Sequence, residues 1–96
     1  MSAFNVVRFK LKPGKDQEFL DAHGPGKADW PGLKKGVIIK TGDDAYCLIG
    51  EWADEESLAA ARSPMISTLN TFRQVLEQTA TGTTDAVSGS VVLTLT

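Results

Sequence analysis

The sequence has very few of the residues that build metal sites and disulfides. Its 96 residues include one histidine, His23, and one cysteine, Cys47. A single cysteine excludes an internal disulfide, and one histidine without a cysteine partner is too little for a metal site of nitrogen and sulfur ligands. Cys47 lies in the apolar run YCLIG, where we interpret it as a small buried residue rather than a nucleophile.

Long apolar runs and a strong charge of one sign are also absent. The net charge of −2 provides no basic surface for nucleic acid. No apolar run approaches the ~20 residues that span a bilayer, and the start MSAFNVVRFK lacks the basic-then-apolar order of a signal peptide. With 42% hydrophobic and 23% charged residues, the sequence predicts one soluble cytoplasmic domain over residues 1–96, without nucleic acid or membrane partners.

The first third of the sequence predicts a strand and a short helix. Residues 4–12, FNVVRFKLK, alternate well enough for a strand that Pro13 and Gly14 stop. Residues 15–23, KDQEFLDAH, suit a helix that ends at Gly24 and Pro25. The glycine- and proline-rich stretch AHGPGKADWPGL is then a helix end followed by a connection.

The middle of the sequence predicts a hairpin and then helix. Strands are expected around 37–40 and 46–52, joined by the polar segment GDD. Asp54 suits a helix N-cap, and Ser63-Pro64 predicts a break before a second helical segment, SPMISTLNTFRQVLEQ. The apolar stripe of that segment indicates packing on a sheet; it consists of Met65, Leu69, Phe72 and Leu76.

The end of the sequence predicts one more strand. The polar, glycine-containing segment TATGTTDAVSGS reads as a connection, and SVVLTLT, residues 90–96, as the last strand. The order of elements is therefore β-α-β-β-α-β, an α+β ferredoxin-like arrangement with a four-stranded antiparallel sheet and helices on one face. Both faces of this sheet carry apolar side chains, so we expect a second copy of the chain to cover the free face in a homodimer.

Two stretches resemble a known group of proteins. VVRFKLKPGKDQEFLDA and YCLIGEWADEESLAAARSP, with the order of elements, are similar to the dimeric α/β-barrel superfamily and within it to the antibiotic-biosynthesis-monooxygenase-like proteins. The second stretch resembles a strand that ends in tryptophan, followed by an acidic helix start and a serine-proline break. The resemblance implies that two sheets pair into a barrel, with a small cavity in each subunit between sheet and helices.

The resemblance implies a cavity without specifying its reaction. Activities in the superfamily include cofactor-independent oxidation of quinol-like aromatics, haem degradation, and isomerase or dehalogenase-like reactions. Haem-degrading members use a histidine on the second long helix, and here residues 54–78 contain none; related sequences commonly have a histidine near Ala61 or at Met65. This departure argues against a haem ligand there, and we expect no cofactor.

Five side chains are candidates for chemistry or for binding an aromatic ligand. As the single imidazole, His23 is the best candidate acid or base, although its place in the last helical turn favours capping or packing. The candidates for substrate binding are Arg8, Trp30, Tyr46 and Trp52. Packing is the favoured interpretation of Trp52. Tyr46 is expected to be a sheet residue with its hydroxyl at the surface, and Arg8 suits a dimer contact as well as a pocket.

Two functional hypotheses remain open at this point. The first is a small homodimeric, cofactor-independent monooxygenase that acts on a small aromatic or quinol-like molecule, with His23 as its catalytic residue. The alternative is a non-catalytic module of the same fold that binds a small ligand or serves as a dimeric partner. The missing helix histidine favours the second slightly.

Overall fold

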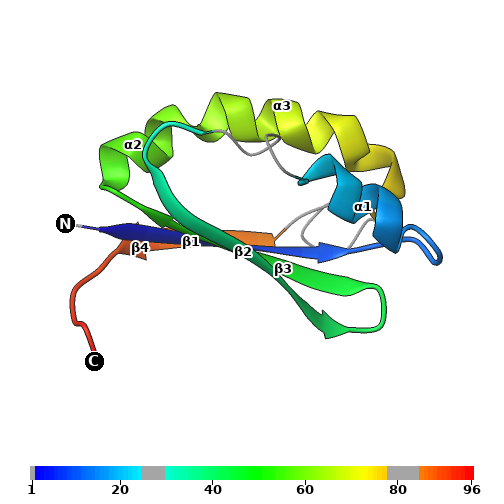
Figure 1. The fold of residues 1–96 in the computed structure, drawn as a ribbon, viewed down its shortest axis with the longest axis horizontal. Helices are drawn as coiled ribbons and strands as arrows, with labels where there is room; N and C mark the ends of the chain where they lie inside the picture. Colours follow the sequence, from blue (N-terminus) through cyan, green and yellow to red (C-terminus); the bar gives the residue numbers. More distant parts are fainter. Residues whose placement is uncertain (1, 25–29, 78–84) are drawn as a thin grey trace.

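The computed structural model contains one antiparallel sheet with helices over one of its faces (Figure 1). It describes residues 2–24, 30–77 and 85–96. The strands are β1 (Ala3–Lys10), β2 (Leu33–Gly42), β3 (Ala45–Trp52) and β4 (Asp85–Ser90), in the spatial order β2-β3-β1-β4. The helices are α1 (Asp16–Ala22), α2 (Glu55–Ala60) and α3 (Arg62–Phe72), and α3 continues into a short 3-10 turn, η1 (Arg73–Val75). This topology confirms the predicted α+β ferredoxin-like fold.

The helical half of the fold begins as the sequence predicts and ends earlier. The side chain of Asp54 accepts a hydrogen bond from the backbone N–H of Ser57 at 2.7 Å, which caps α2. The break between the two helical segments lies at Ala61. The prediction of one helix over residues 63–78 was too long, because η1 follows α3 and Leu76 then bridges to Leu11.

The last strand lies earlier in the chain than predicted. β4 occupies residues 85–90, which the sequence had suggested as a connection, and residues 91–96 form no strand. Ser90 pairs with Ala3, the first residue of β1, so the chain beyond it has almost no strand left to pair with. In Figure 1 this tail runs away from the sheet on the side without helices, and its exposed side chains include Val92, Leu93 and Leu95.

The connection between α1 and β2 is described only in part. Residues 25–29 of the predicted loop lie outside the described residues. Trp30 is buried, and Gly32 follows in the left-handed region with φ of +87°. A Cβ at Gly32 would lie 2.4 Å from the Cβ of Ser57, so glycine is required here both for backbone conformation and for space.

The two faces of the sheet differ in what covers them. Most of the core lies between the helices and the helix-covered face, and it includes the fully buried Phe19 of α1, Leu11 and Trp52. The opposite face, which we call the outer face, carries an apolar row across all four strands, because the strand register aligns Val37, Ile49, Val6 and Val87. Val37 is 41% exposed and Val87 64% exposed, so the single chain leaves part of this row in contact with solvent.

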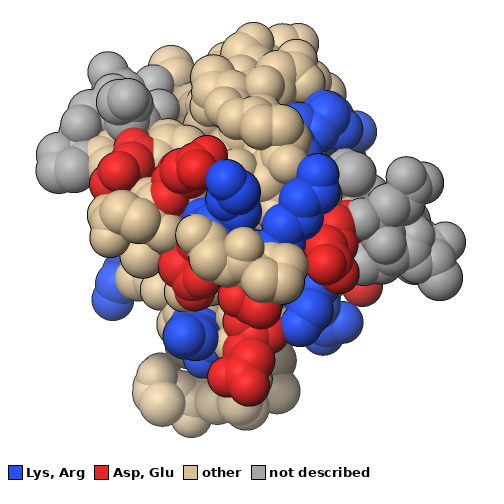
Figure 2. Space-filling view, turned by 90° about the vertical axis from the view of Figure 1, so that its right-hand side faces the viewer, with Lys and Arg blue, Asp and Glu red and all other residues tan. Residues whose placement is uncertain are grey.

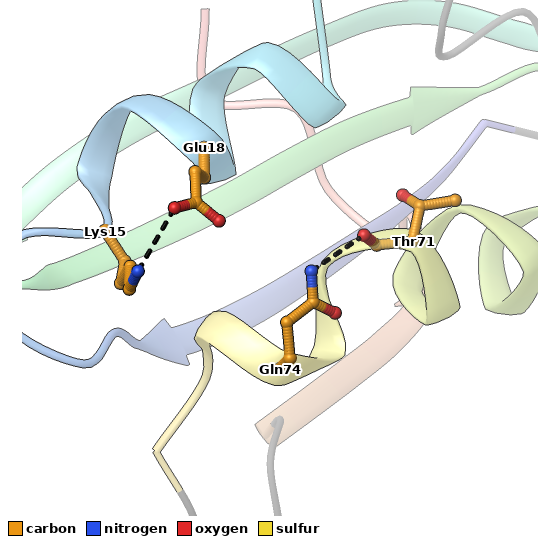
Figure 3. A network of polar contacts seen from close by, with 4 residues as sticks. All are labelled: Lys15, Glu18, Thr71 and Gln74. Carbon is orange, nitrogen blue, oxygen red and sulfur yellow. Dashed lines mark hydrogen bonds and ion pairs between the residues drawn. The ribbon is translucent and has the colours of Figure 1, made fainter.

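Charged side chains of both signs are interspersed at the end of the molecule that carries α1 and the β2–β3 turn (Figure 2). Local contacts support the exposed helix ends there, as Figure 3 shows. Lys15 Nζ lies 3.2 Å from Glu18 Oε1 in α1, and Gln74 donates a hydrogen bond of 3.3 Å to the carbonyl of Thr71. In the described part of the chain, no helix has the length and apolarity needed to cross a membrane.

Candidate functional site

A cavity of about 290 Å³ lies between the helix-covered face of the sheet and α3. Most of its wall is apolar and comes from β1, β3, β4, α2 and α3. The polar side chains among its described lining residues are Asn5, His23, Arg62, Thr68 and Ser88. An apolar cavity with a few convergent polar groups is the usual form of a small-molecule site.

Asn5 is a polar side chain inside an otherwise apolar face of β1. It is 5% exposed, and its Oδ1 accepts a hydrogen bond of 2.8 Å from Trp52 Nε1. This bond fixes the orientation of the amide, because the indole N–H can only donate. The amide nitrogen has as its partner the thioether of Met65 at 4.0 Å, which is a weak acceptor. Asn5 therefore presents a hydrogen-bond donor to the cavity that the protein itself satisfies poorly.

Trp52 and Gly50 hold the Asn5 amide in place. Trp52 is fully buried, and Trp30 stacks on it with ring centroids 6.2 Å apart and ring planes 16° from parallel. A Cβ at Gly50 would lie 2.5 Å from Asn5 Oδ1 and 2.9 Å from Trp52 Nε1. The hydrogen bond between Asn5 and Trp52 thus depends on the absence of a side chain at position 50.

His23 lines the cavity near the aromatic cluster formed by Phe9, Phe19 and Phe72. Its ring centroid lies 4.7 Å from that of Phe72. His23 Nδ1 lies 2.9 Å from the carbonyl oxygen of Phe19, and this oxygen can only accept, so Nδ1 carries the proton. In the neutral ring Nε2 is then the basic nitrogen. Burial lowers the pKa of His23 below its usual 6.5, and the bond to Phe19 opposes this effect in part.

This lowered pKa predicts how stability depends on pH. The unfolded chain binds a proton at His23 more readily than the folded chain, so the free energy of unfolding should fall as the pH drops below 6.5. The slope from His23 must stay below about 1.4 kcal/mol per pH unit, because one group can differ by at most one bound proton between the unfolded and folded chain. We expect urea titrations followed by circular dichroism between about pH 7.5 and about pH 5.5 to show this fall in the wild type. His23→Gln should flatten it; an equal fall in both proteins would assign the effect to other groups.

Asn5 and His23 lie toward opposite ends of the cavity. Asn5 contacts Met65 and His23 contacts Phe72. These two residues are seven positions apart on α3, which corresponds to about 10 Å along the helix axis. A molecule that touches both polar groups must therefore have the length of a bicyclic or tricyclic aromatic.

The structure brings together only some of the side chains that the sequence suggested for this site. His23 and Trp30 line the cavity, and Trp52 stands behind it as the partner of Asn5. Tyr46 does not line the cavity; its hydroxyl donates a short hydrogen bond to Asp16 Oδ2, which lowers the pKa of Asp16 and raises that of Tyr46. This bond ties β3 to α1.

Arg8 also lies away from the cavity. It projects from the outer face of the sheet, its side chain is 72% exposed, and it lies 3.6 Å from Asp85 on the neighbouring strand β4. Strand alternation accounts for this position, because Arg8 has the opposite parity to Asn5 and Phe9. Cys47 is the register partner of Arg8 on β3, so it lies on the same face of the sheet, and it is buried, as the sequence predicted.

Sequence reasoning underestimated two cavity residues. The signal for Asn5 was present, since it shares its strand face with Val7 and Phe9 and a polar residue on an apolar face is informative. Arg62 begins α3, and nothing in the local pattern indicates that it faces the cavity. Among the described residues there is no group of three or more histidine, cysteine, aspartate or glutamate side chains that could hold a metal ion.

The similarity of the overall fold to solved structures is extensive. SnoaB, a cofactor-independent oxygenase from Streptomyces nogalater, matches with a TM-score of 0.76 and 18% identity over 98% of this chain and 96% of its own. A candidate antibiotic biosynthesis monooxygenase from Chloroflexus aurantiacus matches with a TM-score of 0.75 and 15% identity over 98% and 96% of the two chains. This chain has the antibiotic-biosynthesis-monooxygenase-like fold.

That fold is shared by proteins with and without a stated activity. A conserved protein from Methanosarcina mazei has a TM-score of 0.77 and 18% identity over 94% of this chain and 92% of its own. No family model and no curated protein matches the chain. At these identities the likeness concerns the fold, so any function must be argued from the cavity itself.

Proposed function

We propose that the cavity binds a small aromatic molecule with oxygen substituents and that the protein oxidises it with molecular oxygen, without a cofactor. The observation that carries this proposal is the buried amide of Asn5, whose N–H is held toward an apolar cavity with only a thioether as its partner. A phenolic or keto oxygen of a ligand is a far better acceptor for that N–H. SnoaB, a cofactor-independent oxygenase with the same fold, adds support at the level of the fold.

His23 supplies the base that this chemistry needs. Its Nε2 is basic in the neutral ring, and its lowered pKa keeps the ring neutral at pH 7. Removal of a phenolic proton by Nε2 produces an electron-rich anion that reacts with oxygen, and the apolar wall excludes competing water. For a naphthol, one oxygen molecule gives one quinone and one water: the para carbon loses its hydrogen and gains one oxygen atom, and the other oxygen atom leaves as water.

Oxygen uptake with 1,5-dihydroxynaphthalene tests this function. We expect consumption of one oxygen molecule per hydroxynaphthoquinone formed. Asn5→Leu and His23→Gln should each lower kcat by about 100-fold, because general-base and oxyanion contacts typically contribute that much. Trp52→Phe removes the hydrogen bond that orients the Asn5 amide but keeps the amide itself, so it should lower kcat by less than Asn5→Leu does.

The outcomes separate the two functional hypotheses. Unchanged turnover in His23→Gln would remove His23 from the mechanism. Binding of the diol without oxygen uptake would support the alternative, a non-catalytic binding module of the same fold. Absence of binding to the folded wild type, measured by calorimetry, would contradict both.

We further propose that the working unit is a homodimer formed through the outer face. The apolar row of Val37, Ile49, Val6 and Val87 crosses all four strands, and a sheet face of this kind is normally covered. The exposed apolar tail of residues 91–96 leaves the sheet on the same side (Figure 1). A second copy offers an identical apolar face and a tail to cover it, which supports this occupant over an unrelated partner.

A further inference from the structure

Arg62 gives the cavity a charge that the proposed reaction does not use. It is the first residue of α3 and lines the cavity one helical turn before Met65, the residue that contacts Asn5. It is the only lysine or arginine, and there is no aspartate or glutamate, among the described lining residues. The cavity therefore has a positive group near its Asn5 end without an acidic group to balance it.

Arg62 also lacks an internal partner in the described part of the chain. Three other basic side chains there pair with a carboxylate, among them Arg8 with Asp85 at 3.6 Å and Lys40 with Asp16 at 3.8 Å, whereas the exposed Lys12, Lys34 and Lys35 form no such pair. Arg62 forms no ion pair or side-chain hydrogen bond with any residue that the structure describes. A guanidinium beside an apolar cavity is suited to a planar anion, which it binds through two parallel N–H bonds.

The Asn5 amide provides a second, independent indication of a ligand at the same end of the cavity. It is nine-tenths buried or more, and its N–H group faces the cavity with only the Met65 thioether as partner. Asn5 contacts Met65 and Arg62 precedes Met65 by about one helical turn on α3, so both donors belong to the same end of the cavity. A ring that carries an oxygen substituent next to an anionic group satisfies both donors at once.

We propose that Arg62 binds a carboxylate on the aromatic ligand, so that the cavity selects hydroxyaromatic carboxylic acids over neutral phenols. This inference rests on the proposed binding function and specifies its substrate class. The apolar body of the ligand fills the space between β1 and α3, Asn5 donates to the ring oxygen, and Arg62 anchors the acid at the mouth. His23 lies at the far end of the cavity, where it faces a second ring hydroxyl of the substrate and not the carboxylate.

A matched pair of probes tests the proposal by isothermal calorimetry. 1-Hydroxy-2-naphthoate and 1-hydroxy-2-naphthamide share their ring and hydroxyl and differ in the charge of one substituent. We expect the wild type to bind the naphthoate roughly 10- to 100-fold more tightly than the amide, the range for a charge-assisted hydrogen bond. Arg62→Gln should lose this preference and bind the amide unchanged, and Arg62→Lys should keep part of it.

Arg73→Gln is the control, because it removes one positive charge at the other end of the α3–η1 segment and Arg73 does not line the cavity. It should leave both affinities unchanged. Equal wild-type affinities for the two probes, or a parallel loss of both in Arg62→Gln, would overturn the role of Arg62 and leave the cavity as the binding site. Failure of both probes to bind the folded wild type would overturn this proposal together with the proposed function.

Discussion

Trp52→Ala should lower the free energy of unfolding by about 3–5 kcal/mol, the range for truncating a large buried aromatic side chain. Trp52 is completely buried in the core, with an exposed fraction of 0%, and it stacks on Trp30. The substitution also leaves Asn5 Oδ1 without its donor. Urea unfolding followed by far-ultraviolet circular dichroism at one fixed protein concentration measures the loss.

Trp52→Phe separates packing from hydrogen bonding in this experiment. It keeps most of the buried area and removes the indole N–H, so a smaller loss of about 1–3 kcal/mol is expected from the unpaired oxygen of Asn5. A loss below about 1 kcal/mol for Trp52→Ala would contradict the assignment of Trp52 to the core. A loss of the same size in both variants would attribute the whole effect to the hydrogen bond.

Val6→Lys should convert the proposed dimer into a monomer at micromolar concentration. Val6 lies in the middle of the apolar row on the outer face, between Ile49 and Val87. In the single chain a lysine there can extend into solvent, whereas in a face-to-face dimer its charge would be buried without a partner. Size-exclusion chromatography with light scattering measures the mass in solution.

Leu20→Lys is the control for this substitution. Leu20 lies on α1 and is 40% exposed, so Leu20→Lys also replaces an aliphatic side chain with a lysine, but on the helical side of the molecule. We expect the wild type and Leu20→Lys to have the mass of two chains and Val6→Lys the mass of one. A wild type with the mass of one chain, or a Val6→Lys variant that stays dimeric, would contradict pairing through the outer face.

The fold could be predicted from local patterns because most of its elements carry clear signals. Alternation identified β1, and the Asp54 cap identified the start of α2. The last strand could not be placed this way. The alternating residues 91–96 have the better strand pattern, but the edge of β1 is already paired by residues 85–90. Pairing along β1 decides the position of β4, and a single segment does not contain that information.

The candidate site was predictable to a smaller extent. The position of His23 at the end of α1 follows from the sequence, and so does the burial of a tryptophan at a strand end. Whether a side chain reaches the cavity depends on how α3 lies over the sheet. Arg62 faces the cavity because of that arrangement, and Tyr46 bonds to Asp16 because of how α1 lies against β3; no local pattern records either placement.

A crystal structure of the protein with 1,5-dihydroxynaphthalene tests the central claim most directly, because the claim is that Asn5 presents an N–H to a ligand oxygen in this cavity. The account predicts the naphthalene ring between β1 and α3, with one hydroxyl oxygen within about 3.2 Å of Asn5 Nδ2. The other hydroxyl should point toward His23 Nε2. An empty cavity at saturating diol, or a ring bound there with no oxygen near the Asn5 amide, would contradict it.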